Sequence, residues 1–585
     1  MNLYFFQCQE SYGNNIYLPY SSGILWAYVS QFADIKRYYE LGNIYFEKKP
    51  IDEYIGDIED NSIVLFSNYG WNTNYHNEIA KTIKTKLPNT IIIIGGPNAQ
   101  QDYEYLTEHS YIDYCVWGEG EETLLGLLRC IKDNSDFSTV DGISYIKDEY
   151  VKTNTRTRRT NLTDIPSPYL NGVFDNFFTK YNYNFMPVWE TNRGCPYHCS
   201  FCDLGADYYN KLYEFDTDRL LKEIDWFCEK KIEYVEIADA NFGILPRDLD
   251  LVKYIKQKNT DTGYPQKINA TWAKNSPERV FEASRILESI NRGGVTLALQ
   301  SQNKTALDNI HRINIANDRL ESISQKYTEN GIQTYHDFIL GLPGETLTSW
   351  IDGLLYVVDI NPEGWIFGHP LEAYKNTEFS DTEFISKHGL KFTKTPQVSF
   401  FAMRNKNIPL EYGNYVTTTN TMSFNDYIES YLFKWFLITT HSLGWANYSA
   451  KTVSKLKNIK ISDFYKEYYE YTLSNNTYLN VEYSNTKTAL LNTLNNNDFW
   501  GRQMFGENDM YWEYESASSI AIESNRERYF IELDKFIVDI YNLPNIAKEN
   551  SNNCLSHSEV GNISFVEFCQ ETYWRGRRIR KWRKS

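Results

Sequence analysis

The sequence predicts an α/β protein with a doubly wound open sheet, a partial barrel of βα units and a mainly helical C-terminal region. Short apolar strands alternate with helical patterns over residues 1–160 and again over residues 185–395. Between them, residues 161–184 are rich in Pro, Asn, Tyr and Phe, which is typical of an ordered linker. Over residues 396–585 the alternation fades and helical patterns predominate. We therefore expect two α/β domains, a linker and a helical region.

The first domain is expected to be a Rossmann-like sheet. Residues 91–94 are four consecutive isoleucines, as in a central parallel strand that is covered on both faces. Between two strands, residues 74–87 place Ile79, Ile83 and Leu87 at helical spacing. This alternation predicts a doubly wound sheet. The candidate strands are 3–7, 62–67, 90–95 and 112–117.

The second domain has six candidate strands, each followed by a helical pattern. In residues 216–231, for example, Leu220, Ile224 and Phe227 share one helix face, and Asp216 or Thr217 is a candidate cap. Six βα units are too few for an eightfold barrel, so we expect a partial (βα)6 TIM-like barrel with functional residues at the carboxyl ends of its strands. The candidate strands are 188–191, 234–238, 267–272, 295–300, 334–340 and 364–367.

Composition and charge exclude several classes of protein. The chain has 585 residues, of which 42% are hydrophobic and 23% charged, so disorder throughout is excluded. A net charge of −17 argues against nucleic-acid binding through bulk charge. No apolar run reaches the about 18 residues that a bilayer requires. The first residues also lack the basic region of a secretory signal, so we expect a cytoplasmic protein without a membrane partner.

A basic segment, residues 574–584, contrasts with this acidic chain. It contains seven Arg and Lys residues together with Trp574 and Trp582 and can hold phosphates or stack on bases. The alternative, which we favour, is a solvated tail that offsets an acidic body.

Three of the nine cysteines lie within eight residues, directly after the first barrel strand. In a reducing compartment, Cys195, Cys199 and Cys202 indicate a metal-binding or catalytic site. Three thiolates can hold three irons of a cubane cluster and leave the fourth iron open to a small molecule. The alternatives are three buried unpaired cysteines or a structural zinc site with His198 as fourth ligand. The zinc site is disfavoured because His198 adjoins Cys199 and no second Cys pair is near.

The C-x3-C-x-aromatic-x-C spacing, with Phe201 in the aromatic position, resembles the radical S-adenosylmethionine (radical SAM) superfamily. The resemblance implies a [4Fe–4S] cluster on the three cysteines, with SAM bound to the open iron beside Phe201. It implies cleavage of SAM to methionine and a 5′-deoxyadenosyl radical. It also implies an electron donor such as flavodoxin or ferredoxin.

Other barrel segments fit the same superfamily. Glu236 and Asp239 end the second strand, where the resemblance places polar groups near the SAM amino group. This chain lacks the glycine-rich segment that the family has at this strand end. A solvated turn is an equal alternative for the two carboxylates. Gln300 and Ser301 end the fourth strand and either hydrogen-bond SAM or cap the next helix. Residues 337–346 match the fifth-strand signature, although a Pro-Gly turn with a helix cap explains their local shape.

The first domain has glycine turns at the ends of two strands. Glycines at these positions form the crevice in which doubly wound sheets bind ligands, whereas a lone glycine pair indicates only tight packing. The turns at 95–97 and 118–121 occur in order with residues 20–26, 67–72 and 165–175. Taken together, these segments resemble the cobalamin-binding domain that precedes the barrel in one radical SAM subgroup, and this resemblance covers about residues 1–390. The implied cobalamin contacts are Ser67, Asn68, Trp71, Gly95, Gly96, Pro97, Gly118, Glu119 and Gly120.

One departure from that subgroup concerns the cobalt ligand. Many cobalamin domains have a D-x-H-x-x-G stretch whose His binds cobalt, and this chain has none. His76 lies on an expected helix, and we interpret it as a surface or packing residue. The resemblance then implies a lower axial position without protein nitrogen. Tyr69 and Trp71 either line that face or are ordinary core aromatics.

The resemblance implies cobalamin-dependent methyl transfer to an unactivated carbon of a small-molecule or peptide substrate. The alternatives are a non-methylating radical rearrangement or cyclisation, and a non-catalytic Fe–S-binding partner. S-adenosylhomocysteine formed together with 5′-deoxyadenosine would indicate methyl transfer. 5′-Deoxyadenosine alone would indicate rearrangement, and its absence would indicate the non-catalytic partner.

Overall fold

A computed structural model describes residues 1–100, 103–147, 150–205, 207–274, 277–398, 400, 405–496, 498–504 and 510–548. The basic segment 574–584 lies outside these residues. The chain divides into two compact units. Unit 1 contains residues 1–293, 374–378 and 404–412, and unit 2 contains the remainder.

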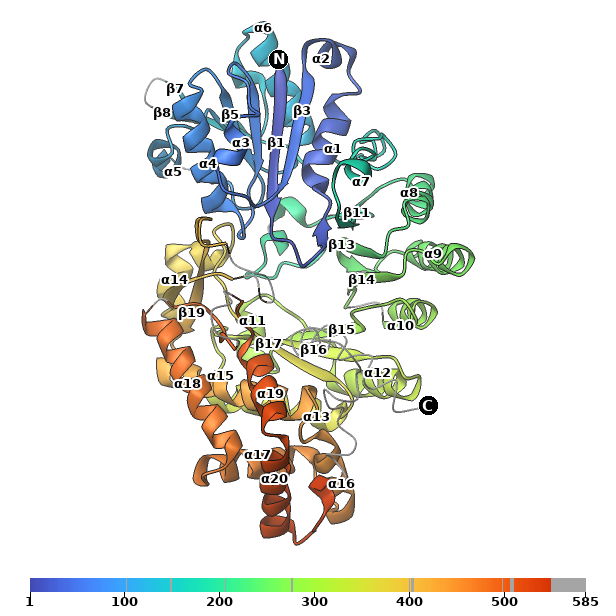
Figure 1. Cartoon of the computed structure of the whole chain (residues 1–585), viewed down its shortest axis with the longest axis vertical. Coiled ribbons are helices and arrows are strands. Elements are labelled where there is room, and N and C mark those ends of the chain that lie inside the picture. Colours follow the sequence, from blue (N-terminus) through green and yellow to red (C-terminus); the bar gives the residue numbers. More distant parts are fainter. Residues whose placement is uncertain are drawn as a thin grey trace. The chain divides into compact units, whose positions relative to one another are not determined.

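Unit 1 begins with the predicted doubly wound sheet, drawn in blue in Figure 1. Its order is β3-β1-β4-β5-β6-β7-β8, and the first five strands are mutually parallel. The parallel strands are β1 (Asn2–Gln9), β3 (Glu40–Glu47), β4 (Ile63–Ser67), β5 (Ile91–Gly95) and β6 (Tyr114–Val116). An antiparallel pair, β7 (Ile143–Lys147) and β8 (Tyr150–Thr153), extends the β6 edge.

The strand order places a switch point at β1. This strand has β3 on one side and β4 on the other, so successive connections leave it in opposite directions. Ligands of open α/β sheets bind beyond the carboxyl ends of the strands at such a point. The pairing also sets Ser67 directly opposite Gly95, which brings two predicted cobalamin turns together at this edge.

Helices cover both faces of the sheet, as the four-isoleucine strand predicts. On one face, aromatic and aliphatic side chains of β1, β4 and β5 form a core with α3 (Asp52–Ile55), α4 (Thr73–Lys86) and α5 (Tyr103–Glu108). Two further helices, α1 (Tyr20–Val29) and α6 (Glu121–Asp133), pack together, and α1 also contacts β1.

The first half of the predicted barrel completes unit 1. Its parallel strands β10 (Val188–Trp189), β13 (Tyr234–Phe242) and β14 (Lys267–Trp272) form one sheet. Helices α8 (Thr217–Glu229), α9 (Asp248–Thr262) and α10 (Pro277–Ile286) alternate with these strands and pack in sequence, as Figure 1 shows in green. Asp216 caps α8, since its carboxylate accepts a hydrogen bond from Arg219 N.

Unit 2 contains the second half of the predicted barrel and the C-terminal helices. The parallel strands β15 (Val295–Gln300), β16 (Thr334–Leu340) and β17 (Trp365–Pro370) form its main sheet. Alternate β16 residues are fully buried, and His336 lies on this buried side. All six predicted barrel strands are confirmed, as two three-stranded sheets that lie in different units.

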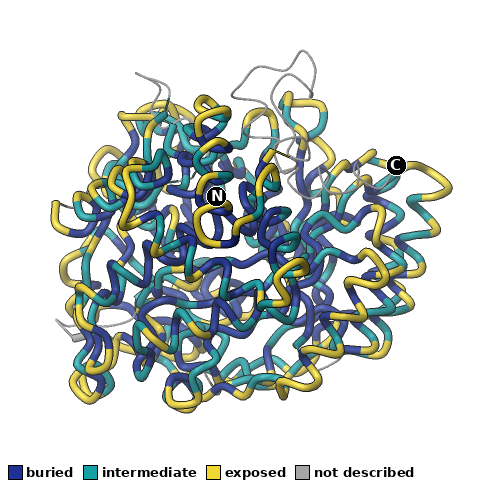
Figure 2. Tube along the Cα trace, turned by 90° about the horizontal axis from the view of Figure 1, so that it is seen from below, coloured by how far each residue is buried: buried dark blue, intermediate teal, exposed yellow. Residues whose placement is uncertain are grey.

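The C-terminal region is mainly helical, as predicted. Its helices are α15 (Phe424–Leu437), α16 (Asn447–Lys457), α17 (Ile461–Ser474), α18 (Tyr478–Asn496), α19 (Tyr514–Ser524) and α20 (Arg526–Tyr541). Residues 438–442 continue α15 as a π-helix, η5 (Ile438–Ser442). In Figure 2 the buried interior is dark blue and the exposed helix turns are yellow. Among the described residues, no helix combines the length and the apolar run that a bilayer crossing needs.

Candidate functional site

The three cysteines lie on a loop whose two ends are joined by a short ladder. Strand β11 (Asn192–Arg193) pairs antiparallel with β12 (Tyr213–Glu214), and the loop runs between them. Inside the loop, Cys195 N donates to Tyr209 O at 2.9 Å, and Cys202 N donates to Cys199 O at 3.0 Å. These bonds fold the loop that carries the three cysteines back on itself.

The thiol environment fits an iron–sulfur cluster. Cys195 and Cys199 are buried and Cys202 is partly buried. Burial raises the pKa of the Cys202 thiol, and negative charge on Cys199 and Cys195 raises it further, so the three groups are near enough to interact. Asn241 Nδ2 donates to Cys195 Sγ at 3.2 Å, a contact suited to a thiolate ligand. Asn241 lies within the 236–242 stretch that the sequence indicated, although its own role was not predicted.

The sequence leaves a single-ion zinc site as an alternative to the cluster. In the part of the chain that the structure describes, no three His, Cys, Asp or Glu side chains meet in an arrangement that holds one metal ion. A zinc site with His198 would require four ligands converging on one point. Thiolates of a cubane instead stand apart, because each binds a different iron. The donor set therefore suits a cluster better than zinc.

Asp239 and Glu236 lie on β13 but differ in their surroundings. Asp239 is fully buried, and its carboxylate accepts hydrogen bonds from the backbone and side chains of Thr191 and Asn192. Burial raises the pKa of Asp239 to about 7, although these donors oppose the shift. The carboxylate thus anchors the turn that leads into the cysteine loop. Glu236 is partly buried and accepts hydrogen bonds from Tyr234 and Asn269.

Gln300 and Ser301 lie in unit 2, at the carboxyl end of β15. Gln300 has a φ of +66°, a strained conformation for a non-glycine residue. Ser301 donates to Glu345 and accepts from Asn303 N, while Asn303 rather than Ser301 caps the next helix. Thr346 caps α13 (Leu347–Ile360), which confirms the helix cap predicted within residues 337–346. The SAM contacts of Phe201, Glu236, Asp239, Gln300 and Ser301 stay predictions.

The turns after β4 and β5 fit a large ligand at the carboxyl edge. Asn68 N donates to Gly95 O, and Asn98 N donates to Asn68 O, so the two turns brace each other. Gly96 has a φ of +104°, and a Cβ there would lie 2.5 Å from Asn68 O. Among the residues that the structure describes, the buried Nδ2 atom of Asn68 has no hydrogen-bond partner, which leaves a donor for a ligand.

The sequence indicates a surface or packing residue at His76, and the structure shows that it is a packing residue. Its ring is fully buried, Nε2 accepts a hydrogen bond from Cys8 N, and Nδ1 therefore donates to Asn68 Oδ1. Burial lowers the pKa of His76 well below its usual range. Both ring nitrogens are engaged, so neither is available to cobalt. Nearby, the Trp71 side chain is half exposed and stacks on Tyr69 with ring centroids 4.5 Å apart.

The third glycine turn, residues 118–120, meets the cysteine loop. Tyr208 belongs to this loop, and its hydroxyl accepts hydrogen bonds from Glu119 N and Arg156 Nε. Gly118 has a φ of +74°, and a Cβ there would lie 2.9 Å from the Tyr208 hydroxyl. The predicted cluster loop and a predicted cobalamin turn are therefore in direct contact within unit 1.

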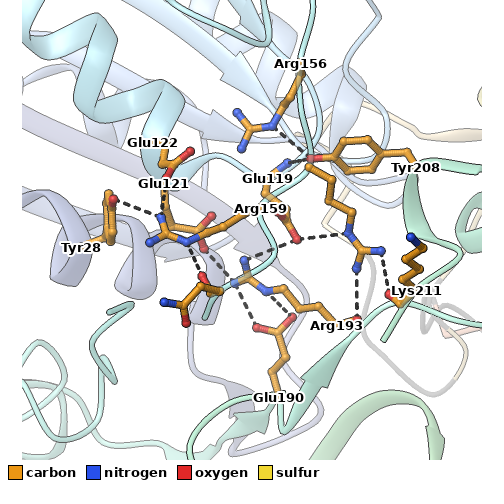
Figure 3. Close-up of polar contacts among 12 residues, drawn as sticks. Tyr28, Glu119, Glu121, Glu122, Arg156, Arg159, Glu190, Arg193, Tyr208 and Lys211 are labelled. Atoms are coloured by element: carbon orange, nitrogen blue, oxygen red, sulfur yellow. Dashed lines mark hydrogen bonds and ion pairs between the residues drawn. The ribbon is translucent and has the colours of Figure 1, made fainter. Parts of the chain in front are cut away.

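A network of buried charges surrounds this contact (Figure 3). Arg193 pairs with Glu121 at 2.7 Å and Glu190 at 3.0 Å, and lies 4.0 Å from Glu119. Burial raises the pKa of Glu119. Burial also acts to raise the pKa of Glu121, but the Arg193 charge opposes it and the pKa of Glu121 is lowered. Sequence reasoning missed Arg193, because Glu121 and Glu119, which join it to the first domain, are distant in the chain.

Comparisons with known proteins agree with this geometry. Residues 189–354 match the model of the radical SAM superfamily, and residues 24–128 match that of the B12 binding domain. The cobalamin-dependent radical SAM methyltransferase TokK of Streptomyces tokunonensis is 31% identical over 462 residues, 78% of this chain and 68% of that protein. The 2-(S-pantetheinyl)-carbapenam-3-carboxylate methyltransferase of Streptantibioticus cattleyicolor is 30% identical, with the same coverage.

A solved structure extends the likeness of fold to nearly the whole chain. The cobalamin-dependent SAM radical enzyme OxsB, solved with aqua-cobalamin and SAM bound, superposes with a TM-score of 0.58 at 15% identity. The match covers 96% of this chain and 84% of that one. The predicted fold class is confirmed.

Proposed function

Because the chain belongs to the cobalamin-dependent radical SAM methyltransferases, whose cofactors are a [4Fe–4S] cluster, SAM and cobalamin, we propose that it methylates an unactivated carbon of a small molecule. The observation that carries this proposal is the contact between the cysteine loop and the 118–120 turn, made by Tyr208. An enzyme that uses both cofactors in one reaction must hold them near each other.

The chain contributes binding, orientation and exclusion of water. When bound, the cofactors supply a methyl group and a 5′-deoxyadenosyl radical that opens a C–H bond. Cys195, Cys199 and Cys202 would hold the cluster, and Asn241 would support the first of these ligands. Burial of Cys195 and Cys199 keeps water away from the cluster.

The substrate class follows from the relatives. One relative is named for a carbapenam carboxylate, which makes a small carboxylate-bearing metabolite the first class to test. The proposed electron donor is a flavodoxin or ferredoxin, and the proposed location is the cytoplasm. Nothing in this proposal involves nucleic acid or a membrane.

The test is a product analysis under anaerobic conditions. The reconstituted protein, with hydroxocobalamin and methyl-deuterated SAM, is reduced and incubated with small carboxylate-bearing candidates. We expect S-adenosylhomocysteine and 5′-deoxyadenosine together, and a product that carries the deuterated methyl group. 5′-Deoxyadenosine alone would favour rearrangement or cyclisation, and the absence of both would favour a non-catalytic Fe–S protein.

A further inference from the structure

Arg158 lies between the two matched regions, 24–128 and 189–354, so neither family model covers it. It follows β8, and its side chain is only 9% exposed. A buried guanidinium needs several partners to offset the loss of water. The partners of Arg158 come from two separate places in unit 1.

The first partners are the two ends of the cysteine loop. Arg158 Nη1 donates to Lys211 O at 2.7 Å, and Nη2 donates to Arg193 O at 3.1 Å. The three cysteines lie between these two carbonyls in the sequence. Since the β11–β12 ladder contains only two residue pairs, these bonds supply much of the closure of the loop. A single side chain therefore clamps both ends.

The shape of the clamp requires arginine. The guanidinium lies over the Tyr213 ring at 4.7 Å and near the Tyr209 ring at 5.7 Å. A Cβ on Gly194 would lie 2.1 Å from Lys211 O and 2.8 Å from Arg158 Nη2, so the glycine before Cys195 leaves room for both the guanidinium and the carbonyl that it binds. A lysine keeps the charge but cannot donate to two separated carbonyls from a planar fork.

The remaining partner is Glu119, in the turn predicted to bind cobalamin. Arg158 Nε lies 3.8 Å from Glu119 Oε1, and both side chains are less than a tenth exposed. Neither Glu119 oxygen has a hydrogen-bond partner among the described residues, so its negative charge is offset mainly by Arg158 and Arg193. This pair ties the clamp to the neighbouring turn.

We propose that Arg158 is a positioning residue, which clamps the cysteine loop and, through Glu119, fixes the cluster relative to cobalamin. The clamp follows from contacts within the chain, whereas the second part rests on the cofactors of the proposed function. The two parts therefore receive separate tests.

The first test uses the protein without cofactors. Hydrogen exchange of residues 194–211 is measured by mass spectrometry in Arg158→Met, Arg158→Lys and the wild type. We expect exchange about tenfold faster in both variants, because both lose the paired donation. The matched control is Arg159→Met, since Arg159 is equally buried but pairs with Glu122 and Asp164, away from the loop. Unchanged exchange in a folded Arg158 variant would overturn the clamp.

The second test uses the reconstituted protein with hydroxocobalamin, reduced so that cluster and cobalt are both paramagnetic. Pulsed electron paramagnetic resonance then reports the distribution of distances between them. We expect a broader distribution in Arg158→Lys and in Glu119→Gln, which keeps the clamp but loses the charge pair, with unchanged iron content. The Arg159→Met distribution should match the wild type.

These readouts separate the possible failures. Faster loop exchange with an unchanged distance distribution would overturn the link to cobalamin. Failure of methyl transfer with both expected results would contradict the proposed function and leave the positioning role supported. If Arg158→Met does not fold, Arg158→Lys decides the first test.

Discussion

The cysteine loop of unit 1 and the π-helix of unit 2 both hold polar residues against parallel strands, but they do so differently. Around the loop, Arg158, Arg193 and Glu119 are buried charges, and the Glu119 oxygens have no hydrogen bonds among the described residues. In the π-helix, His441 is buried, and its Nε2 donates to Gly364 O just before β17.

The π-helix region is held mainly by neutral hydrogen bonds, although Thr439 Oγ1 is buried without a hydrogen-bond partner among the described residues. His441 Nδ1 faces the Tyr465 hydroxyl and Asn447 Nδ2, and Ser442 Oγ accepts from Ile366 N. These contacts lie at the amino end of β17, where polar residues of α/β barrels serve stability. The cysteine loop follows a carboxyl end, where such folds place their chemistry. The comparison teaches that buried charges surround the cysteine loop at the cofactor end, whereas neutral polar groups hold the π-helix at the amino end of β17.

The largest effect is expected from a substitution of a cluster cysteine at the cofactor end. In Cys195→Ala, loss of one thiolate should remove the cluster, so iron and sulfide fall to background and 5′-deoxyadenosine formation stops. Anaerobic iron and sulfide analysis, with chromatography of SAM products, measures both. The matched control is Cys228→Ala, because the Cys228 thiol lies on α8, outside the cysteine loop, and donates to Tyr264 O, so its loss should leave the cluster intact. Full sulfide content in Cys195→Ala would refute the assignment.

Removing Arg193 should cost stability without removing a ligand. Arg193→Met leaves Glu121 and Glu190 buried near each other without their shared cation, so we expect a loss of about 3–5 kcal/mol in unfolding free energy. Urea unfolding of the cofactor-free protein measures it. Arg129→Met removes a surface pair with Asp34 and should cost at most about 1 kcal/mol. Equal costs for the two variants would argue against a buried network.

A substitution in the π-helix should lower the stability of the protein and leave its iron content unchanged. His441→Phe removes hydrogen bonds to Tyr465, Asn447 and Gly364, and we expect a loss of about 1–3 kcal/mol with unchanged iron content. Thermal unfolding and iron analysis on the same samples test this. A loss of iron would show that this region also supports the cluster.

The smallest expected effect concerns pH and His336. Burial lowers the pKa of His336 to about 3, against about 6.5 for an unfolded histidine. The unfolded chain binds the extra proton between these values, so stability falls as pH drops below about 6.5, by at most about 1.4 kcal/mol per pH unit. His336→Gln should lose this slope. Parallel urea titrations of both proteins between pH 5 and 8 measure the difference, and identical slopes would contradict a neutral buried ring.

Local patterns predicted most of the fold. The strands Lys267–Trp272, Val295–Gln300 and Thr334–Leu340 have the predicted bounds, because each is a short apolar run between polar turns. Strand β3 was missed because Gly42 and Asn43 interrupt its first half, and the antiparallel pair β7 and β8 was also missed. Such strands depend on pairing with neighbours, which a single sequence does not reveal.

Like the fold, the site contains residues that local sequence patterns predicted and residues that they did not. The three cysteines were found because their spacing is local, and the glycine turns because they end strands. Arg158, Arg193 and Tyr208 were not found, since they act through partners up to about ninety residues away in the chain. Tertiary packing decides which of these distant residues come into contact, and the periodicity of the sequence does not reveal it.

The stacked pair of Tyr69 and Trp71 gives the protein an optical reporter. Trp71 is 51% exposed and follows β4, at the edge where we expect the corrin to bind. A corrin absorbs where indole emits, so its arrival should quench the emission of this ring. Replacing Trp71 with phenylalanine keeps an aromatic surface and removes that part of the signal, which turns a half-exposed side chain into a titration of cobalamin occupancy by fluorescence.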